Sequence, residues 1–245
     1  MLHADDLDLA DGVEEQPFTC AAQGRTVPGV VWTPAGSRGD AEALVLIGHG
    51  ATAHKRIEYV VALARRLVRE HGIAAAAIDG PGHGARRNMP ADDATVFSEF
   101  LAEWSRPAST DEMVADWTAA IDAARSLPGV GRGPLGYWGL SMGTIYGIPL
   151  VAEESDVAAA VFGLMGLVGP TRDRMAADAA RLNCPVLFLQ QWDDSLVPRV
   201  NSSELFDAIA SPDKRLHAHP GDHAQVPAEE LAFSAEFLAG QLLDR

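Results

Sequence analysis

The feature that most constrains the fold is a repeated alternation between short apolar runs and longer amphipathic segments. Continuous apolar runs such as 43–47 are typical of strands that are buried on both faces. Apolar residues at helical spacing follow, as in 58–70. Strands that alternate with helices favour a mostly parallel sheet with helices on both faces, so we predict an α/β fold. The strands are expected over 43–47, 73–78, 135–138, 158–164, 186–190 and 215–219, and the helices over 58–70, 111–127, 144–152, 204–210 and 227–243.

The N-terminal part of the chain departs from this alternation. Residues 16–33 alternate apolar and polar side chains on either side of Gln23-Gly24, which predicts a β-hairpin. Towards the other end, the interval from 164 to 186 is too short for a large cap domain. We therefore expect residues 1–245 to form a single domain.

The longest irregular insert covers residues 85–110. Within it, four large apolar side chains recur at helical spacing, which predicts a short helix over 95–104. This helix could pack on the core as a surface element, or it could form a small lid over a site. Periodicity alone favours neither.

Composition excludes several classes of partner. The net charge of −15 argues against nucleic acids and anionic membranes, which bind basic surfaces. No run of about 18 apolar residues is present, and the acidic first fifteen residues do not resemble a secretion signal. We therefore expect a cytoplasmic protein that acts on a small molecule, as a monomer or homodimer. Cys20 and Cys184 form no metal or redox motif and are expected to be buried thiols.

The pentapeptide Gly139–Gly143 places Ser141 between an apolar strand-like run and a helix-like one. A serine on such a sharp turn needs neighbours without Cβ, so that the helix can pack closely and Oγ stays exposed. Chance alone would supply about 0.1 matches in a chain of this composition. The pattern predicts a nucleophilic serine only if the rest of the chain supplies its partners.

A serine hydroxyl is a weak nucleophile unless a general base, usually histidine, takes its proton. His223 follows the last predicted strand, at the sheet edge where reactive residues gather, and is the expected base. His49 is the main rival. The carboxylate that orients the base should lie between the serine and the histidine in the chain. Asp193 and Asp194, directly after the strand 186–190, both satisfy this order.

Two further histidines, His217 and His219, are two residues apart in a predicted strand and so share one face. They are expected to be partly exposed strand residues. A metal pair at this spacing lacks a third ligand in the sequence pattern. We accordingly expect no metal site and no cofactor.

An acyl-transfer serine also needs donors for the oxyanion that forms during the reaction. One is the backbone N–H of Met142, the residue after the nucleophile. The second is expected from Ala51 in the glycine-containing loop after the strand 43–47, which His49 would brace. Just beyond, His54 and Lys55 could contact a substrate or remain solvated.

A second glycine-rich turn, Asp79–Gly84, follows the strand 73–78 and is expected to be tight and fixed. It lacks the Gly-Lys-Ser/Thr and Gly-x-Gly-x-x-Gly patterns of nucleotide-binding loops, so we discount phosphate binding. Arg86 follows this turn and could meet an anionic substrate group or lie at the surface.

Taken together, these motifs resemble the α/β-hydrolase superfamily over nearly the whole chain. The matching segments are His49–Ala51, Asp79–Gly84, Gly139–Gly143, Asp194–Pro198 and Gly221–His223. In the family the aspartate that opens Asp-x-x-Val-Pro is the acid, so the resemblance implies Asp194 rather than Asp193.

The segments 29–34 and 48–55 further resemble the dienelactone-hydrolase-like and small serine esterase branch. True dienelactone hydrolases use cysteine at the elbow, whereas this chain has Ser141, which argues against a dienelactone substrate. The resemblance implies a serine hydrolase that cleaves a carboxylic ester through an acyl-enzyme. Acyl transfer, amide or peptide hydrolysis and carbon–carbon bond cleavage are alternatives for the same triad, and a non-catalytic binding protein is a third class.

Overall fold

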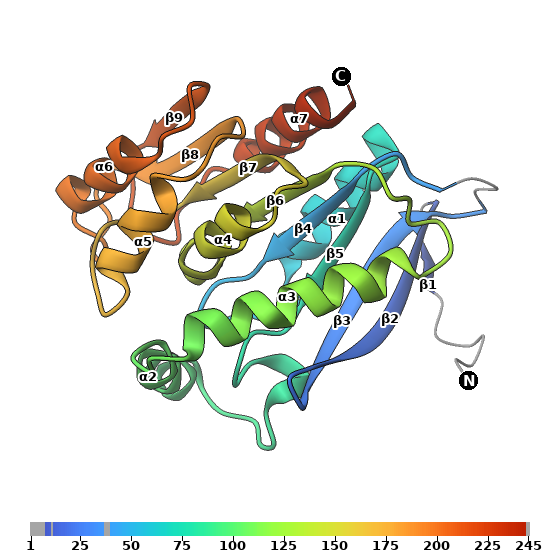
Figure 1. Ribbon diagram of the computed structural model, residues 1–245, viewed down its shortest axis with the longest axis horizontal. Coiled ribbons are helices and arrows are strands. Elements are labelled where there is room, and N and C mark those ends of the chain that lie inside the picture. Colours follow the sequence, from blue (N-terminus) through green and yellow to red (C-terminus); the bar gives the residue numbers. More distant parts are fainter. Residues whose placement is uncertain (1–7, 11, 37–39, 244–245) are drawn as a thin grey trace.

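The computed structural model describes residues 8–10, 12–36 and 40–243, so the first residues of the acidic N-terminal segment, 1–7, lie outside the described residues. The described strands form one nine-stranded sheet in the order β1-β2-β3-β5-β4-β6-β7-β8-β9 (Figure 1). In chain order the strands are β1 (Asp8–Ala10), β2 (Val13–Ala22), β3 (Arg25–Pro34), β4 (Leu44–Gly48), β5 (Ala74–Ile78), β6 (Leu135–Gly139), β7 (Val157–Gly163), β8 (Val186–Gln191) and β9 (Lys214–His219).

The N-terminal hairpin is confirmed. Strands β2 and β3 pair antiparallel throughout their length, and the connecting Gln23 and Gly24 both have positive φ, as a two-residue hairpin turn requires. Strand β3 then pairs antiparallel with β5. From β5 to β9 every neighbouring pair is parallel, as the sequence predicts.

Helices cover both faces of the sheet (Figure 1). The helices are α1 (Glu58–His71), α2 (Asp93–Trp104), α3 (Ser109–Arg125), α4 (Met142–Glu153), α5 (Arg172–Ala179), α6 (Arg199–Ala208) and α7 (Glu229–Leu243), with a short 3₁₀ turn η2 (Gly84–Arg86).

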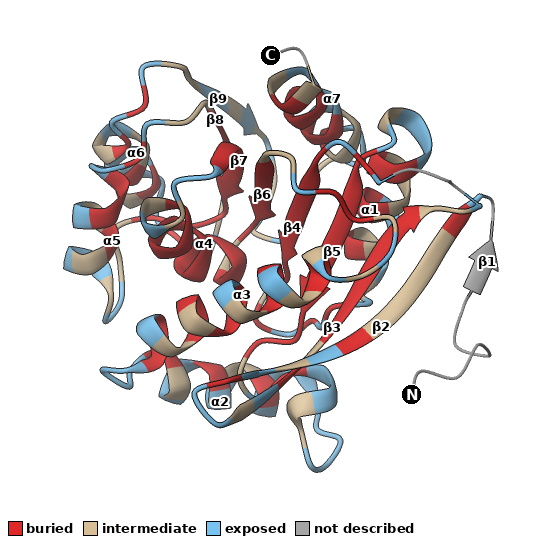
Figure 2. Ribbon diagram, turned by 45° about the vertical axis from the view of Figure 1, so that its right-hand side comes forward, coloured by how far each residue is buried: buried red, intermediate tan, exposed pale blue. Residues whose placement is uncertain are grey.

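The apolar core is divided by the sheet into two layers. One cluster joins the sheet to α1 and α7, through residues such as Leu63 and Leu238. The other joins the opposite face to α3, α4, α5 and α6, through residues such as Trp117 and Ile148. The central strands are buried on both faces, whereas the helices are exposed on their outer sides (Figure 2). This burial explains why the central strands are continuous apolar runs in the sequence.

The insert 85–110 forms η2, the helix α2 and the first residues of α3. Helix α2 begins two residues before the predicted start, because the Asp92 side chain caps it by accepting a hydrogen bond from the Thr95 N–H. Its inner face is held by Phe100, which stacks on Trp104, and by the Trp104 indole N–H, which donates to Thr171 Oγ1 over 2.8 Å. Whether α2 moves as a lid stays a prediction.

The sequence gives no indication of α5, which the structure adds between β7 and β8. This helix buries Met175, Asp178 and Ala179, and its other residues are three charged residues and two alanines, so it lacks the wide apolar stripe by which amphipathic helices are identified. No helix in the described part of the chain combines the length and the hydropathy that a membrane crossing requires.

Candidate active site

Ser141 lies in the turn between β6 and α4, with φ of 57° and ψ of −117°. This is a backbone conformation that a residue with a side chain adopts only under strain. Two contacts to the Gly163 carbonyl oxygen hold the turn in this conformation. The Ser141 N–H donates to this oxygen over 2.9 Å, and the buried Thr144 hydroxyl contacts it at 2.7 Å. The strained turn predicted between strand and helix is therefore present, whereas the role of Ser141 as a nucleophile stays a prediction.

The two glycines of the elbow are required by close backbone approach. A Cβ on Gly143 would lie 2.8 Å from the carbonyl oxygen of Gly48, which belongs to the neighbouring strand β4. A Cβ on Gly139 would lie 2.8 Å from the carbonyl oxygen of Gly143. These positions tolerate no side chain without movement of the backbone, as the sequence argument expects.

His223 connects Ser141 to a carboxylate. Its Nε2 lies 3.0 Å from Ser141 Oγ, and its Nδ1 lies 2.8 Å from Asp194 Oδ2. The three residues come from three separate loops, which follow β6, β8 and β9 at the carboxyl edge of the parallel strands. The imidazole and the carboxylate side chains are 16% and 5% exposed, so water competes little for their hydrogen bond.

Asp194 rather than Asp193 contacts the imidazole. The remaining oxygen of Asp194, Oδ1, accepts hydrogen bonds from the N–H groups of Leu196 and Val197, which fixes the orientation of the carboxylate. Asp193 instead accepts a long hydrogen bond of 3.3 Å from the Gly221 N–H. The geometry thus agrees with the choice that the resemblance implies.

A third carboxylate joins the loops that carry the acid and the base. Asp222 Oδ1 accepts hydrogen bonds from the N–H groups of Ser195 and His223, at 2.8 and 2.7 Å. These two backbone donors hold the pKa of Asp222 below its usual value. Sequence reasoning missed this role, because a carboxylate beside the base in the chain gives no sign of which backbone donors it will meet.

His49 is unsuited to act as the base. Both ring nitrogens are engaged, with Nδ1 2.8 Å from the Gly50 carbonyl oxygen and Nε2 accepting from the Gly80 N–H at 2.9 Å. Burial, together with the nearby His83, lowers the pKa of His49 to about 3, so the ring is neutral. The prediction that His49 braces its loop agrees with these contacts.

Ala51 and Met142 lie in two loops that are next to each other, as their expected role as oxyanion donors requires. Gly48 at the end of β4 pairs with Gly139 at the end of β6, so the loop that contains Ala51 begins beside the elbow. Its position is held by His83, whose Nε2 lies 2.7 Å from the Ala51 carbonyl oxygen. Met142 is the first residue of α4, and N–H groups in the first turn of a helix have no intrahelical acceptor. Donation by both to an oxyanion stays a prediction.

Lys55 is engaged inside the protein. Its ammonium lies 2.5 Å from Asp79 Oδ2, and the Lys55 and Ala85 N–H groups also donate to this carboxylate. Burial alone would raise the pKa of Asp79, but these hydrogen bonds outweigh burial and hold the pKa below its usual value. A Cβ on Gly84, which has φ of 48°, would lie 2.3 Å from the same carboxylate. The predicted tight turn is thus built around Asp79.

Arg86 is similarly committed, since its guanidinium lies 2.7 Å from a carboxylate oxygen of the fully buried Asp116. His54 is exposed, and its Nδ1 accepts a hydrogen bond from the Arg56 N–H. Contact of His54, Lys55 or Arg86 with a substrate stays a prediction. For Lys55 and Arg86, the geometry favours a structural role instead.

One cluster outside the triad was not expected. His217 and His219 lie partly exposed on one face of β9, as predicted, but a third potential ligand, Glu230 of α7, contacts both. The sequence pattern missed it because Glu230 belongs to the next element, and only the return of the chain from β9 to α7 brings it close.

A model of the dienelactone hydrolase family matches residues 30–230. The chain belongs to the dienelactone hydrolase family. The expected resemblance to α/β-hydrolases is thereby confirmed, and the assignment makes this family member a hydrolase. Among curated proteins none matches the sequence.

Solved structures agree with the assignment. A PEG-bound cold-adapted esterase from an Arctic intertidal metagenomic library is 39% identical, with a TM-score of 0.86 over 99% of this chain and 100% of that one. A zinc-bound structure of such an esterase is 37% identical, with a TM-score of 0.80 over 96% of each chain. A putative dienelactone hydrolase from Klebsiella pneumoniae subsp. pneumoniae is 21% identical, with a TM-score of 0.74 over 96% of this chain and 100% of that one, and shows the shared fold.

Proposed function

We propose that this family member is a serine carboxylesterase that hydrolyses a small-molecule ester through an acyl-enzyme. The observation that carries the proposal is the continuous hydrogen-bonded series from Ser141 Oγ through His223 to Asp194. Such a series is the arrangement by which a neutral hydroxyl becomes a nucleophile near pH 7. The esterases that resemble this chain at more than 35% identity support an ester as the substrate class.

In the first half of the reaction, His223 Nε2 takes the proton of Ser141 as Oγ attacks the ester carbonyl carbon. The carbonyl oxygen becomes an oxyanion, which the N–H groups of Met142 and Ala51 stabilise. The bond from carbon to the alcohol oxygen then breaks, and the leaving oxygen takes the proton from His223. The products at this stage are the free alcohol and an ester between the acyl group and Ser141.

In the second half, His223 deprotonates a water molecule, which attacks the acyl carbon. The bond to Ser141 Oγ breaks, the serine regains its proton from His223, and the carboxylic acid leaves. Asp194 holds the imidazole in the tautomer that presents Nε2 to the serine and stabilises the imidazolium that forms twice in the cycle.

The proposal is tested with p-nitrophenyl esters of increasing acyl length and with a fluorophosphonate probe. We expect saturable hydrolysis and covalent labelling of Ser141, and loss of both in Ser141→Ala. Because a related esterase was solved with zinc bound, the assays are run with and without EDTA. We expect hydrolysis to persist in EDTA, since the triad uses only side chains. A folded protein that neither hydrolyses these esters nor reacts with the probe would refute the proposal.

The same assay separates the alternatives that share the triad. Acyl transfer would produce a new ester or amide when an alcohol or amine acceptor is added, at the expense of the free acid. Amide hydrolysis would appear with p-nitroanilide substrates. We expect the p-nitrophenyl esters to be cleaved much faster than either of these reactions proceeds.

A further inference from the structure

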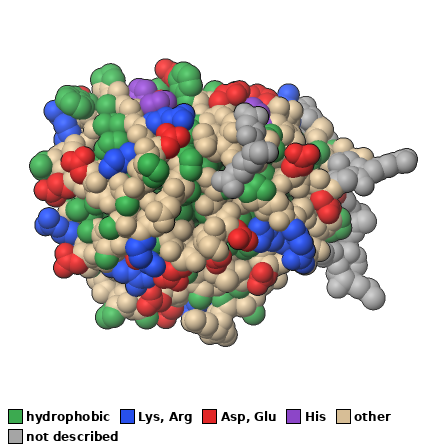
Figure 3. Space-filling model, turned by 45° about the horizontal axis from the view of Figure 1, so that its top comes forward, with side chains coloured by type: hydrophobic (Ala, Val, Ile, Leu, Met, Phe, Trp, Pro, Cys, Tyr) green, Lys and Arg blue, Asp and Glu red, His purple; other side chains and the backbone are tan. Residues whose placement is uncertain are grey.

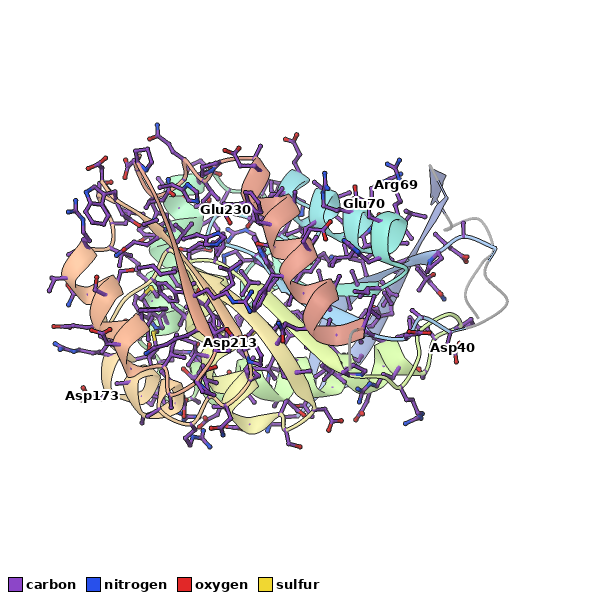
Figure 4. All side chains as sticks on the ribbon, turned by 90° about the horizontal axis from the view of Figure 1, so that it is seen from above. Asp40, Arg69, Glu70, Asp173, Asp213 and Glu230 are labelled. Carbon is purple, nitrogen blue, oxygen red and sulfur yellow. The ribbon has the colours of Figure 1, made fainter. Side chains whose placement is uncertain are left out.

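Three side chains with metal-ligating atoms meet where β9 and α7 lie side by side. His217 Nδ1 is 3.0 Å and His219 Nε2 is 2.6 Å from Oε1 of Glu230. The potential ligand atoms of the three residues all lie within 4.8 Å of one another. Figure 4 labels Glu230 near the start of α7, beside the last strand of the sheet.

The burial of Glu230 calls for an explanation. Its side chain is only 1% exposed, and the ion-pair partners described for it are the two histidines. Burying a carboxylate is costly unless a charge or several hydrogen bonds compensate it. A lysine or arginine would be the usual partner, yet among the described residues two histidine side chains take that place.

The donor set is the one that zinc takes in proteins. Two imidazole nitrogens and one carboxylate oxygen form a three-ligand site that leaves a fourth tetrahedral position open. Ligand atoms about 2.0–2.1 Å from a tetrahedral ion lie about 3.3 Å apart, so the His217 and His219 nitrogens would need to move away from Glu230 Oε1 by about 0.3 and 0.7 Å. The His217 and His219 side chains are 37% and 22% exposed, and Figure 3 shows histidine atoms at the surface in the region of β9.

We propose that His217, His219 and Glu230 bind a divalent transition-metal ion, with Zn²⁺ as the best match. The ion would replace the protons that the imidazoles now direct at the carboxylate, and a water molecule would complete the tetrahedron. The site is separate from the triad, and its existence does not depend on the proposed esterase function.

The position of the cluster gives the ion a consequence for the triad. His219 is the last residue of β9 and Glu230 is the second residue of α7, so an ion bound by both fastens the two ends of the loop 220–228. That loop carries His223. This consequence rests on the proposed function: the bound ion should restrict the movement of the catalytic base, and removal of the ion should weaken catalysis without abolishing it.

The chain offers a matched control. Glu70, His71 and Glu236 form a second group whose ligand atoms lie within the same distance. That group has one histidine and two carboxylates, and the Glu236 side chain is 67% exposed, so it resembles a solvated surface cluster more than a preformed site. His71→Asn should therefore leave high-affinity metal binding unchanged.

The test measures binding directly, by isothermal titration of EDTA-treated full-length protein with ZnCl₂. We expect one tight site, which is lost in the His217→Asn/His219→Asn double variant and retained in His71→Asn. Co²⁺ in place of zinc should give the visible absorption of a tetrahedral complex in the wild type but not in the double variant. Zinc at 100-fold above its Kd should raise the Tm by about 5–10 °C.

No tight binding by the wild type, or binding that survives the double substitution in a variant with a native circular dichroism spectrum, would overturn the proposal. Loss of binding in His71→Asn alone would place the ion in the control cluster and refute it as well. Ser141→Ala should bind zinc as the wild type does. Binding and hydrolysis can thus fail separately, which keeps the two proposals distinguishable.

Discussion

Replacing Lys55 by methionine separates a structural role from a substrate contact. Lys55 and Asp79 form an ion pair at 2.5 Å, with side chains that are 10% and 0% exposed. Removing one partner of a buried pair costs about 3–5 kcal/mol, because the other charge stays buried and uncompensated. Asp79 keeps hydrogen bonds from two backbone N–H groups, so we expect the lower end of this range. For a chain of this size, about 3 kcal/mol corresponds to a fall in Tm of about 6–12 °C.

The assay combines thermal unfolding, followed by circular dichroism, with steady-state ester hydrolysis below the Tm of the variant. A structural role predicts a large fall in Tm and a small change in KM. The double variant Lys55→Met/Asp79→Asn should recover much of the stability, since neither charge then remains buried. An unchanged Tm with a strongly raised KM would refute this reasoning and assign Lys55 to the substrate.

Three further outcomes follow from the geometry. Asp194→Asn should lower kcat by about 10⁴-fold with little change in stability, by analogy with the aspartate of the serine-protease triad, whereas Asp193→Asn should stay within about tenfold of the wild type. Gly143→Ala should lower the Tm and remove most of the activity, because the new Cβ would lie 2.8 Å from the Gly48 carbonyl oxygen. A clash of this kind costs about 1–3 kcal/mol. The pKa of Asp79 is lowered in the folded state, so its contribution to stability is present above its unfolded pKa and is lost as the pH falls through the folded value. Urea unfolding between pH 7 and pH 3 can follow this loss of stability. The pH dependence of the unfolding free energy should be weaker in Asp79→Asn.

The sheet was predictable from sequence because its central strands are buried on both faces. Runs such as Leu44–Gly48 and Val157–Gly163 are continuously apolar, and no exposed face interrupts them. The hairpin was predictable because Gln23 and Gly24 match a turn that requires positive φ at both positions. Helix α5 was missed because a short helix, half of whose residues are charged, has no wide apolar stripe to detect.

The candidate site was likewise predictable only in part. The elbow was predictable because backbone crowding at Gly139 and Gly143 leaves a local pattern in the sequence. The ion-pair partners of Lys55 and Arg86 were not predictable, since an ion pair depends on which loops the sheet brings together. The sequence pattern does not distinguish a charged side chain in water from one in a buried pair. Glu230 was missed for the same reason, because its meeting with two histidines depends on where α7 begins.

The measurement that tests the central claim most directly is the intact mass of the protein, acid-quenched within milliseconds of mixing with a p-nitrophenyl ester. The proposed mechanism predicts a transient mass increase equal to the acyl group, located by proteolysis on the peptide that contains Ser141 and absent from Ser141→Ala. Rapid hydrolysis with no acylated species, or acylation on a residue other than Ser141, would contradict the mechanism proposed for this site.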